Sequence, residues 1–159
     1  MQFELLINQL ELNGFEQYEI SNFARNKKYA IHNTAYWKNE PYLGIGPSAH
    51  SFNKTSRSWN IANNNLYMKA IEAKQPSYES EILSDENQMN EYLMTGLRTM
   101  WGCDLNHISS RFGIRFSELL LPKIKQKESE GLIEINGRSF KLTRSGKLFA
   151  DGIAGGFFV

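Results

Sequence analysis

Cysteine is almost absent from this sequence, because Cys103 is the single cysteine among 159 residues. One cysteine cannot form an intramolecular disulfide, and it cannot supply the several thiolates that hold an iron–sulfur cluster. Such sparse use of cysteine fits a reducing compartment and predicts a cytoplasmic location.

Long apolar runs and an excess of one charge are also missing. No apolar stretch approaches the roughly 20 residues of a membrane-spanning helix, and residues 1–7 lack the basic leader of a signal peptide. The chain has 18 Lys and Arg against 17 Asp and Glu, a formal net charge of +1. No overall field therefore attracts nucleic acid or an anionic membrane surface. We expect a globular protein without a membrane span.

Residues 3–20 have the pattern of a helix followed by a strand. Apolar residues recur at near-helical spacing up to Leu12, Asn13 and Gly14 end the helix, and residues 15–20 alternate like a strand. This is the second half of a β-α-β unit, which needs further strands to pack against.

Polar, aromatic and glycine residues are concentrated between residues 21 and 60. On a helix, His32 and Tyr36 would share one face; by themselves they are more typical of a partly buried cluster than of a ligand site. Residues 42–46 resemble a short strand whose glycines permit either a tight bend or close approach of a ligand, and both readings stay open. The segment lacks the full pattern of a nucleotide-binding loop, and the histidines lack the spacing of a zinc site.

The second half predicts a connecting helix over residues 60–74, a boundary near Ser84, and then three helices and a hairpin turning at Asn136–Gly137. Three helices and a hairpin form a winged-helix-like module. Its basic residues alternate with glutamates, so the module lacks the continuous positive surface that contacts the phosphates of DNA. A structural or partner-docking role is favoured over DNA binding. The last six residues are expected to form a frayed or docking tail with two exposed phenylalanines.

Four segments in this order carry a family resemblance. They are residues 14–24, His32-Asn33-x-x-Tyr36-Trp37, residues 42–51 and Arg57-x-Trp59-Asn60. Together they resemble the late part of the oxygen-independent coproporphyrinogen III oxidase family of radical S-adenosylmethionine (SAM) proteins, and the His-Asn-x-x-Tyr-Trp signature is closer to the haem-chaperone branch. The similarity extends over essentially the whole chain.

The resemblance implies an α/β plus α+β fold, in which terminal β/α units of a partial radical SAM barrel precede the winged-helix-like C-terminal domain. The expected division is 1–60 for the end of the barrel, 61–84 for a connecting helix and linker, and 85–159 for the C-terminal domain. The family's cluster motif is absent here, so we expect a catalytically inactive C-terminal fragment that holds no cofactor. The parent would bind a 4Fe–4S cluster, SAM and haem.

By the same resemblance, particular residues inherit candidate roles, while no catalytic residue and no cluster ligand is expected in this chain. The candidates for the wall of the SAM pocket are Gly44, Gly46 and His50. The candidates for haem or porphyrin are His32, Asn33, Tyr36 and Trp37. Weaker pocket candidates are Glu19 and Asn22.

The implied function is haem handling in porphyrin metabolism. The expected partners are a tetrapyrrole and a haem-accepting protein, and binding of nucleic acid is not expected. Oxidative decarboxylation of coproporphyrinogen III and a free-standing nucleic-acid-binding or protein-binding module remain the alternatives.

Overall fold

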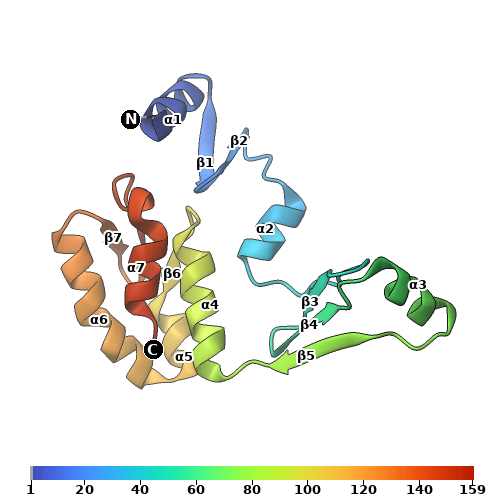
Figure 1. Cartoon of the computed structure of the whole chain (residues 1–159). Helices are drawn as coiled ribbons and strands as arrows, with labels where there is room; N and C mark the ends of the chain where they lie inside the picture. Colours follow the sequence, from blue (N-terminus) through green and yellow to red (C-terminus); the bar gives the residue numbers. More distant parts are fainter. Residues whose placement is uncertain (1) are drawn as a thin grey trace.

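A helix and a two-stranded hairpin begin the chain in the computed structural model, which describes residues 2–159 (Figure 1). Helix α1 (Gln2–Leu12) is followed by Gly14, whose φ of +77° suits glycine at a helix end. Strands β1 (Phe15–Glu19) and β2 (Asn22–Arg25) pair antiparallel. The predicted helix and strand are confirmed here, whereas β2 was not expected.

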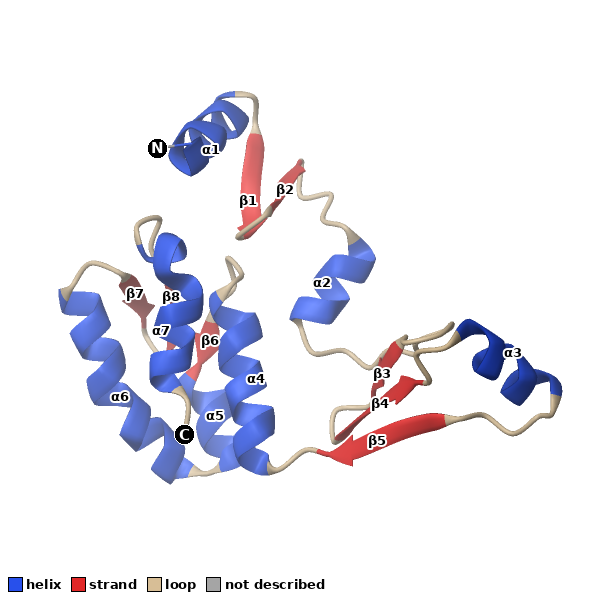
Figure 2. Cartoon of the chain, viewed as in Figure 1, coloured by secondary structure: helices blue, strands red, loops and turns tan. Residues whose placement is uncertain are grey.

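The middle of the chain contains a three-stranded antiparallel sheet in the order β3-β4-β5 (Figure 2). Its elements, with the two helices beside them, are α2 (Ile31–Trp37), β3 (His50–Phe52), β4 (Ser56–Asn60), α3 (Asn64–Glu72) and β5 (Tyr78–Ile82). Helix α3 begins after Asn63, whose side chain accepts a hydrogen bond from the Leu66 N–H.

Two local predictions for this part are wrong. The strand expected over residues 42–46 is reduced to an isolated bridge between Tyr42 and Phe52, since Gly44 and Gly46 leave the chain bent there. The helix expected from residue 60 starts later because Asn60 still pairs, as the end of β4, with Tyr78 of β5. A strand thus lies in the segment expected to be a linker.

The C-terminal part, called the C-terminal module below, contains the three helices and the hairpin that the sequence predicts. Its elements are α4 (Asp85–Leu97), β6 (Cys103–Asp104), α5 (Leu105–Phe112), α6 (Ile114–Ser129), β7 (Ile133–Asn136), β8 (Ser139–Leu142), the 3-10 helix η1 (Gly146–Phe149) and α7 (Ala150–Phe157). The sheet order is β6-β8-β7, and Gly137 occupies the hairpin turn with a φ of +62°. The main apolar core lies inside this module.

The prediction of a docking tail with two exposed phenylalanines is wrong. Residues 150–157 form α7, which packs on α4. Ile153, Ala154 and Phe157 lie on one face of this helix, and Phe157 is 1% exposed against 38% for Phe158. Burial of this apolar face outweighs the poor helix propensity of Gly155 and Gly156.

The N-terminal hairpin is joined to the turn that follows α4. The Ile20 N–H donates to the Arg98 carbonyl at 3.0 Å, and the Met100 N–H donates to the Tyr18 carbonyl at 2.9 Å. The turn therefore extends the edge of β1. The strands between residues 2 and 159 close no barrel, and within the same residues no helix combines the length and apolar character needed to cross a membrane.

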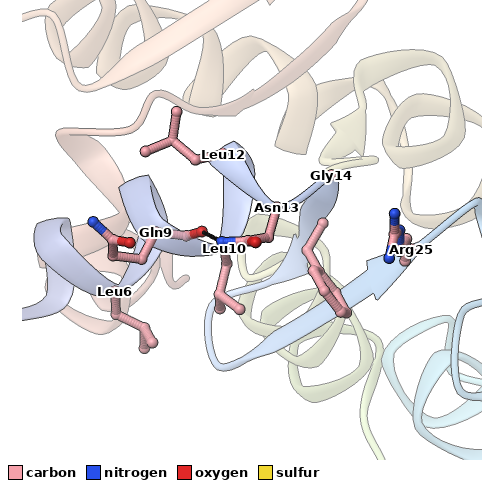
Figure 3. A pocket seen from close by; sticks show the side chains of 8 residues that line it. Leu6, Gln9, Leu10, Leu12, Asn13, Gly14 and Arg25 are labelled. Carbon is pink, nitrogen blue, oxygen red and sulfur yellow. Dashed lines mark hydrogen bonds between the residues drawn. The ribbon is translucent and has the colours of Figure 1, made fainter.

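A large hollow of about 650 Å³ lies beside α1 and the start of β1 (Figure 3). Leu6 and Leu10 point into it from α1, and Arg25 of β2 lies at its far side. None of the predicted site residues lines this hollow.

Candidate functional site

A second cavity, of about 620 Å³, lies between α2, the bend at residues 42–44 and the strands β3 and β4. Its lining residues are His32, Tyr36, Tyr42, Leu43, Gly44, His50 and Arg57. Two of these were predicted for a tetrapyrrole and two for SAM. The fold thus brings parts of both predicted sites into one cavity, whose volume is within the roughly 300–1,000 Å³ typical of ligand sites.

Helix α2 presents His32 and Tyr36 to this cavity from one face, as their spacing predicts. Both side chains are accessible to solvent, and Tyr36 is 48% exposed. The Tyr36 ring lies 6.0 Å from the ring of Tyr42, which lies 6.0 Å from the ring of Phe52. Phe52 is buried behind the cavity, whereas Tyr36 and Tyr42 line it and offer aromatic faces to a planar ligand.

The glycines of the bend are explained by the packing of the chain on itself. A Cβ atom on Gly44 would lie 2.1 Å from the His50 carbonyl oxygen, so the two backbones approach too closely for any side chain. Gly46 has a φ of +112°, a conformation that favours glycine. The Asn60 amide donates to the carbonyls of both glycines, at 3.2 Å and 2.9 Å. Gly46 does not line the cavity.

Asn33 and Trp37 do not line this cavity either, although they belong to the same sequence signature. The Asn33 Oδ1, Thr34 Oγ1 and Trp37 Nε1 atoms are buried without a hydrogen-bond partner in the described part of the chain. The Arg98 guanidinium lies over the Trp37 ring, 5.2 Å from its centre. A direct tetrapyrrole contact by Asn33 or Trp37 stays a prediction.

Glu19 and Asn22 form a buried polar network at the end of β1. Glu19 Oε1 accepts from Arg98 Nε at 3.2 Å, and Oε2 accepts from the Ser21 N–H at 2.9 Å and from the Asn22 amide. The Glu19 side chain is fully buried. The network joins β1 to the C-terminal module, and a pocket role for either residue stays a prediction.

Three lining residues received no role from the sequence, namely Leu43 and the polar residues Arg57 and Tyr42. Arg57 projects from β4 and pairs with Glu91 of α4 and, at 3.7 Å, with Glu81 of β5. Tyr42 has a raised pKa because burial disfavours its charged form, so its phenol keeps its proton at neutral pH. Both residues lie in the segments of the family resemblance. Only the folding back of β4 over the bend reveals that they face α2.

Comparison with known proteins shows which proteins this chain is similar to. The family model described as HemN C-terminal domain matches residues 83–149. The chain is 31% identical over 156 residues to the haem chaperone HemW of Bacillus subtilis, covering 98% of this chain and 41% of that protein. It is 29% identical to HemW of Lactococcus lactis, covering 91% of this chain and 38% of that protein. The chain therefore resembles a HemN/HemW-type C-terminal region.

A solved structure supports the same assignment at the level of the fold. The coproporphyrinogen III oxidase HemN of Escherichia coli, a radical SAM enzyme, superimposes with a TM-score of 0.75 at 16% identity. The match covers 98% of this chain and 40% of that chain. The chain therefore has the α/β arrangement of the solved protein while spanning about two fifths of the length of these relatives.

Residues of this chain do not fit an iron–sulfur cluster. Among residues 2–159, no three His, Cys, Asp or Glu side chains are gathered as metal ligands. Cys103 is buried between α4 and β8, and this burial raises the pKa of its thiol, which disfavours the thiolate that a cluster needs.

Proposed function

We propose that this chain is the tetrapyrrole-binding C-terminal region of a HemW-type haem chaperone. The observation that carries the proposal is the single cavity that gathers His32 and Tyr36 of α2 with Gly44 and His50. Two imidazoles, two phenol rings and one guanidinium around about 620 Å³ suit a planar ligand with acidic substituents. The HemW relatives support the choice of haem.

Four lining residues form the tetrapyrrole side of the cavity in this proposal. The His32 imidazole is the candidate ligand of the haem iron, since histidine is a common axial ligand. Tyr36 and Tyr42 pack against the macrocycle. Arg57 brings a permanent positive charge to the cavity, and its five N–H donors allow it to contact a propionate in addition to its glutamate partners.

In the complete protein, the side of the cavity formed by Gly44, Gly46 and His50 would face SAM. Asn33 and Trp37 would support the tetrapyrrole side from behind, and Glu19 and Asn22 would stabilise the strand end near it. The cluster would be held by residues outside this chain, so the chain alone would not cleave SAM reductively. A cytoplasmic location and a haem-accepting protein complete the proposal.

The C-terminal module serves as a structural or docking element in this proposal, and DNA is not its ligand. Lys127 pairs with Glu130 at 2.6 Å, and Lys141 of the hairpin pairs with Glu134 at 2.7 Å. Neutralised cations provide few free charges for phosphate contacts.

Haem titration of the purified chain, followed by absorption spectroscopy, tests the proposal. His32→Ala should weaken binding by more than about tenfold, which corresponds to ~1.4 kcal/mol of binding free energy, and should move the Soret band. His107→Ala is the control, because His107 lies on α5 and does not line the cavity.

Iron-free porphyrin separates the two branches of the family. A ligand held through iron should bind the wild-type chain more tightly than the iron-free macrocycle. Equal affinity for both, with no effect of His32→Ala, would favour the oxidase alternative and remove His32 from the site. Absence of any haem binding by the wild-type chain would refute the proposed function.

A further inference from the structure

One face of α4 carries three polar residues that reach into the N-terminal half of the chain. Glu91, Thr95 and Arg98 are spaced by four and three residues, so they follow one another along the helix surface. We call these three residues the α4 stripe. Core residues such as Leu93 and Leu97 lie on the opposite side of the helix, where both are buried.

Every member of the α4 stripe contacts α2, the residues just after it, or β4. Glu91 accepts from the Arg57 guanidinium of β4. Thr95 Oγ1 accepts from Asn39 Nδ2 at 3.1 Å, and Asn39 lies two residues after the end of α2. At the far end of the stripe, Arg98 covers the ring of Trp37 within α2.

These contacts reach both walls of the cavity. His32 and Tyr36 of α2 form one wall, and Arg57 of β4 belongs to the other. A smaller cavity of about 140 Å³ shares Tyr36, Tyr42 and Arg57 with the main one and is also lined by Glu91 and Thr95. Two members of the stripe therefore lie next to residues of both walls.

Arg98 is held in a fixed orientation. Its Nε and Nη2 each lie 3.2 Å from Glu19 Oε1, and its Nη1 lies 2.6 Å from Asp151 of α7. Glu19 is itself fixed, because its second oxygen accepts from the backbone and from Asn22. The guanidinium is planar, and its N–H groups at the edge of the plane are bound by Glu19 and Asp151. One flat face of the group is therefore held against the Trp37 indole.

We propose that the α4 stripe positions the walls of the cavity, with Arg98 as the positioning residue for α2. The C-terminal module then sets the separation of the two walls that a ligand meets. The consequence for haem rests on the proposed function, whereas the effect on Trp37 does not.

The test compares Arg98→Gln with Arg144→Gln in the 159-residue chain. Arg144 is the matched control because it also joins the C-terminal module to the N-terminal half, through Glu11 of α1 at 3.1 Å and through Asn8. It lines neither cavity. Arg98→Lys is a third variant, which keeps the charge but lacks the planar group that covers the indole.

Two readouts are measured on each variant. The indole ¹H–¹⁵N resonance of Trp37, assigned with Trp37→Phe, reports the position of α2 without haem. Haem titration reports the cavity. We expect Arg98→Gln and Arg98→Lys to move the Trp37 resonance and Arg98→Gln to weaken haem binding about tenfold, while Arg144→Gln changes neither readout.

The outcomes separate this proposal from the proposed function. A Trp37 resonance that does not move in Arg98→Gln overturns the positioning of α2. A moved resonance with unchanged haem affinity overturns the link to the cavity. If the wild-type chain binds no haem but Arg98→Gln moves Trp37, the proposed function fails and the positioning of α2 stands. Equal effects of Arg98→Gln and Arg144→Gln would reduce the stripe to general structural support.

Discussion

Replacing Gly44 by alanine should loosen the bend that forms one side of the candidate site. The φ of Gly44 is not in the left-handed region, so backbone strain is not the cause. The cause is steric, because the new Cβ would lie 2.1 Å from the oxygen and 2.6 Å from the carbon of the His50 carbonyl. The neighbours are backbone atoms that cannot rotate away.

The cost follows from the hydrogen bonds that hold the two backbones together. The Gly44 N–H donates to Ser51 Oγ at 2.9 Å, and Tyr42 and Phe52 exchange two backbone hydrogen bonds of 2.9 Å. Separating the segments would lose two or three of these bonds, each contributing about 0.5–1.5 kcal/mol. We expect Gly44→Ala to lower the free energy of unfolding by about 1–4.5 kcal/mol.

Urea unfolding followed by tryptophan fluorescence measures this change, since Trp59 lies opposite His50 in the adjoining strand. Gly152→Ala is the control, because Gly152 lies within α7 and a Cβ there meets no atom within 4 Å. That control should be neutral or stabilising by up to about 1 kcal/mol. Equal stabilities of Gly44→Ala and the wild type would refute the close backbone approach.

Two further expectations concern the C-terminal module. Cys103 should resist alkylation by iodoacetamide at pH 8 in the folded protein, because burial raises the pKa of its thiol. It should react once urea unfolds the protein. Rapid reaction of the folded protein would contradict the buried position of Cys103. Leu93→Ala should cost about 2–5 kcal/mol in urea unfolding, because Leu93 is fully buried. Leu119→Ala, at a half-exposed position, should cost much less, and similar losses in both variants would argue against the assigned core.

The sequence predicts the C-terminal module well because its signals are local. Helical periodicity locates α4 to α6, and the Asn136–Gly137 pair locates the hairpin. Helix α7 was missed because Gly155 and Gly156 weaken its local signal, whereas packing against α4 decides its structure.

Strand β5 and the candidate site show the limit of local patterns. All residues of β5 (Tyr78–Ile82) are exposed, so no buried apolar face marks the strand, and its pairing with β4 depends on a distant segment. The spacing of His32 and Tyr36 puts them on one face only if the segment is helical, and the helix itself had to come from the structure. Arg57 and Tyr42 were not assigned to the site because their position opposite α2 depends on the chain folding back between residues 42 and 60.

The bonds between β1 and the turn after α4 also have a consequence for how the chain folds. Glu19 and Arg98 are 79 residues apart in sequence, so the hairpin completes its edge by closing a long loop. Such non-local pairing slows folding, and during synthesis the hairpin emerges before its partner exists. The buried Glu19 carboxylate therefore stays hydrated until the C-terminal module has formed, which makes docking of the hairpin a late step.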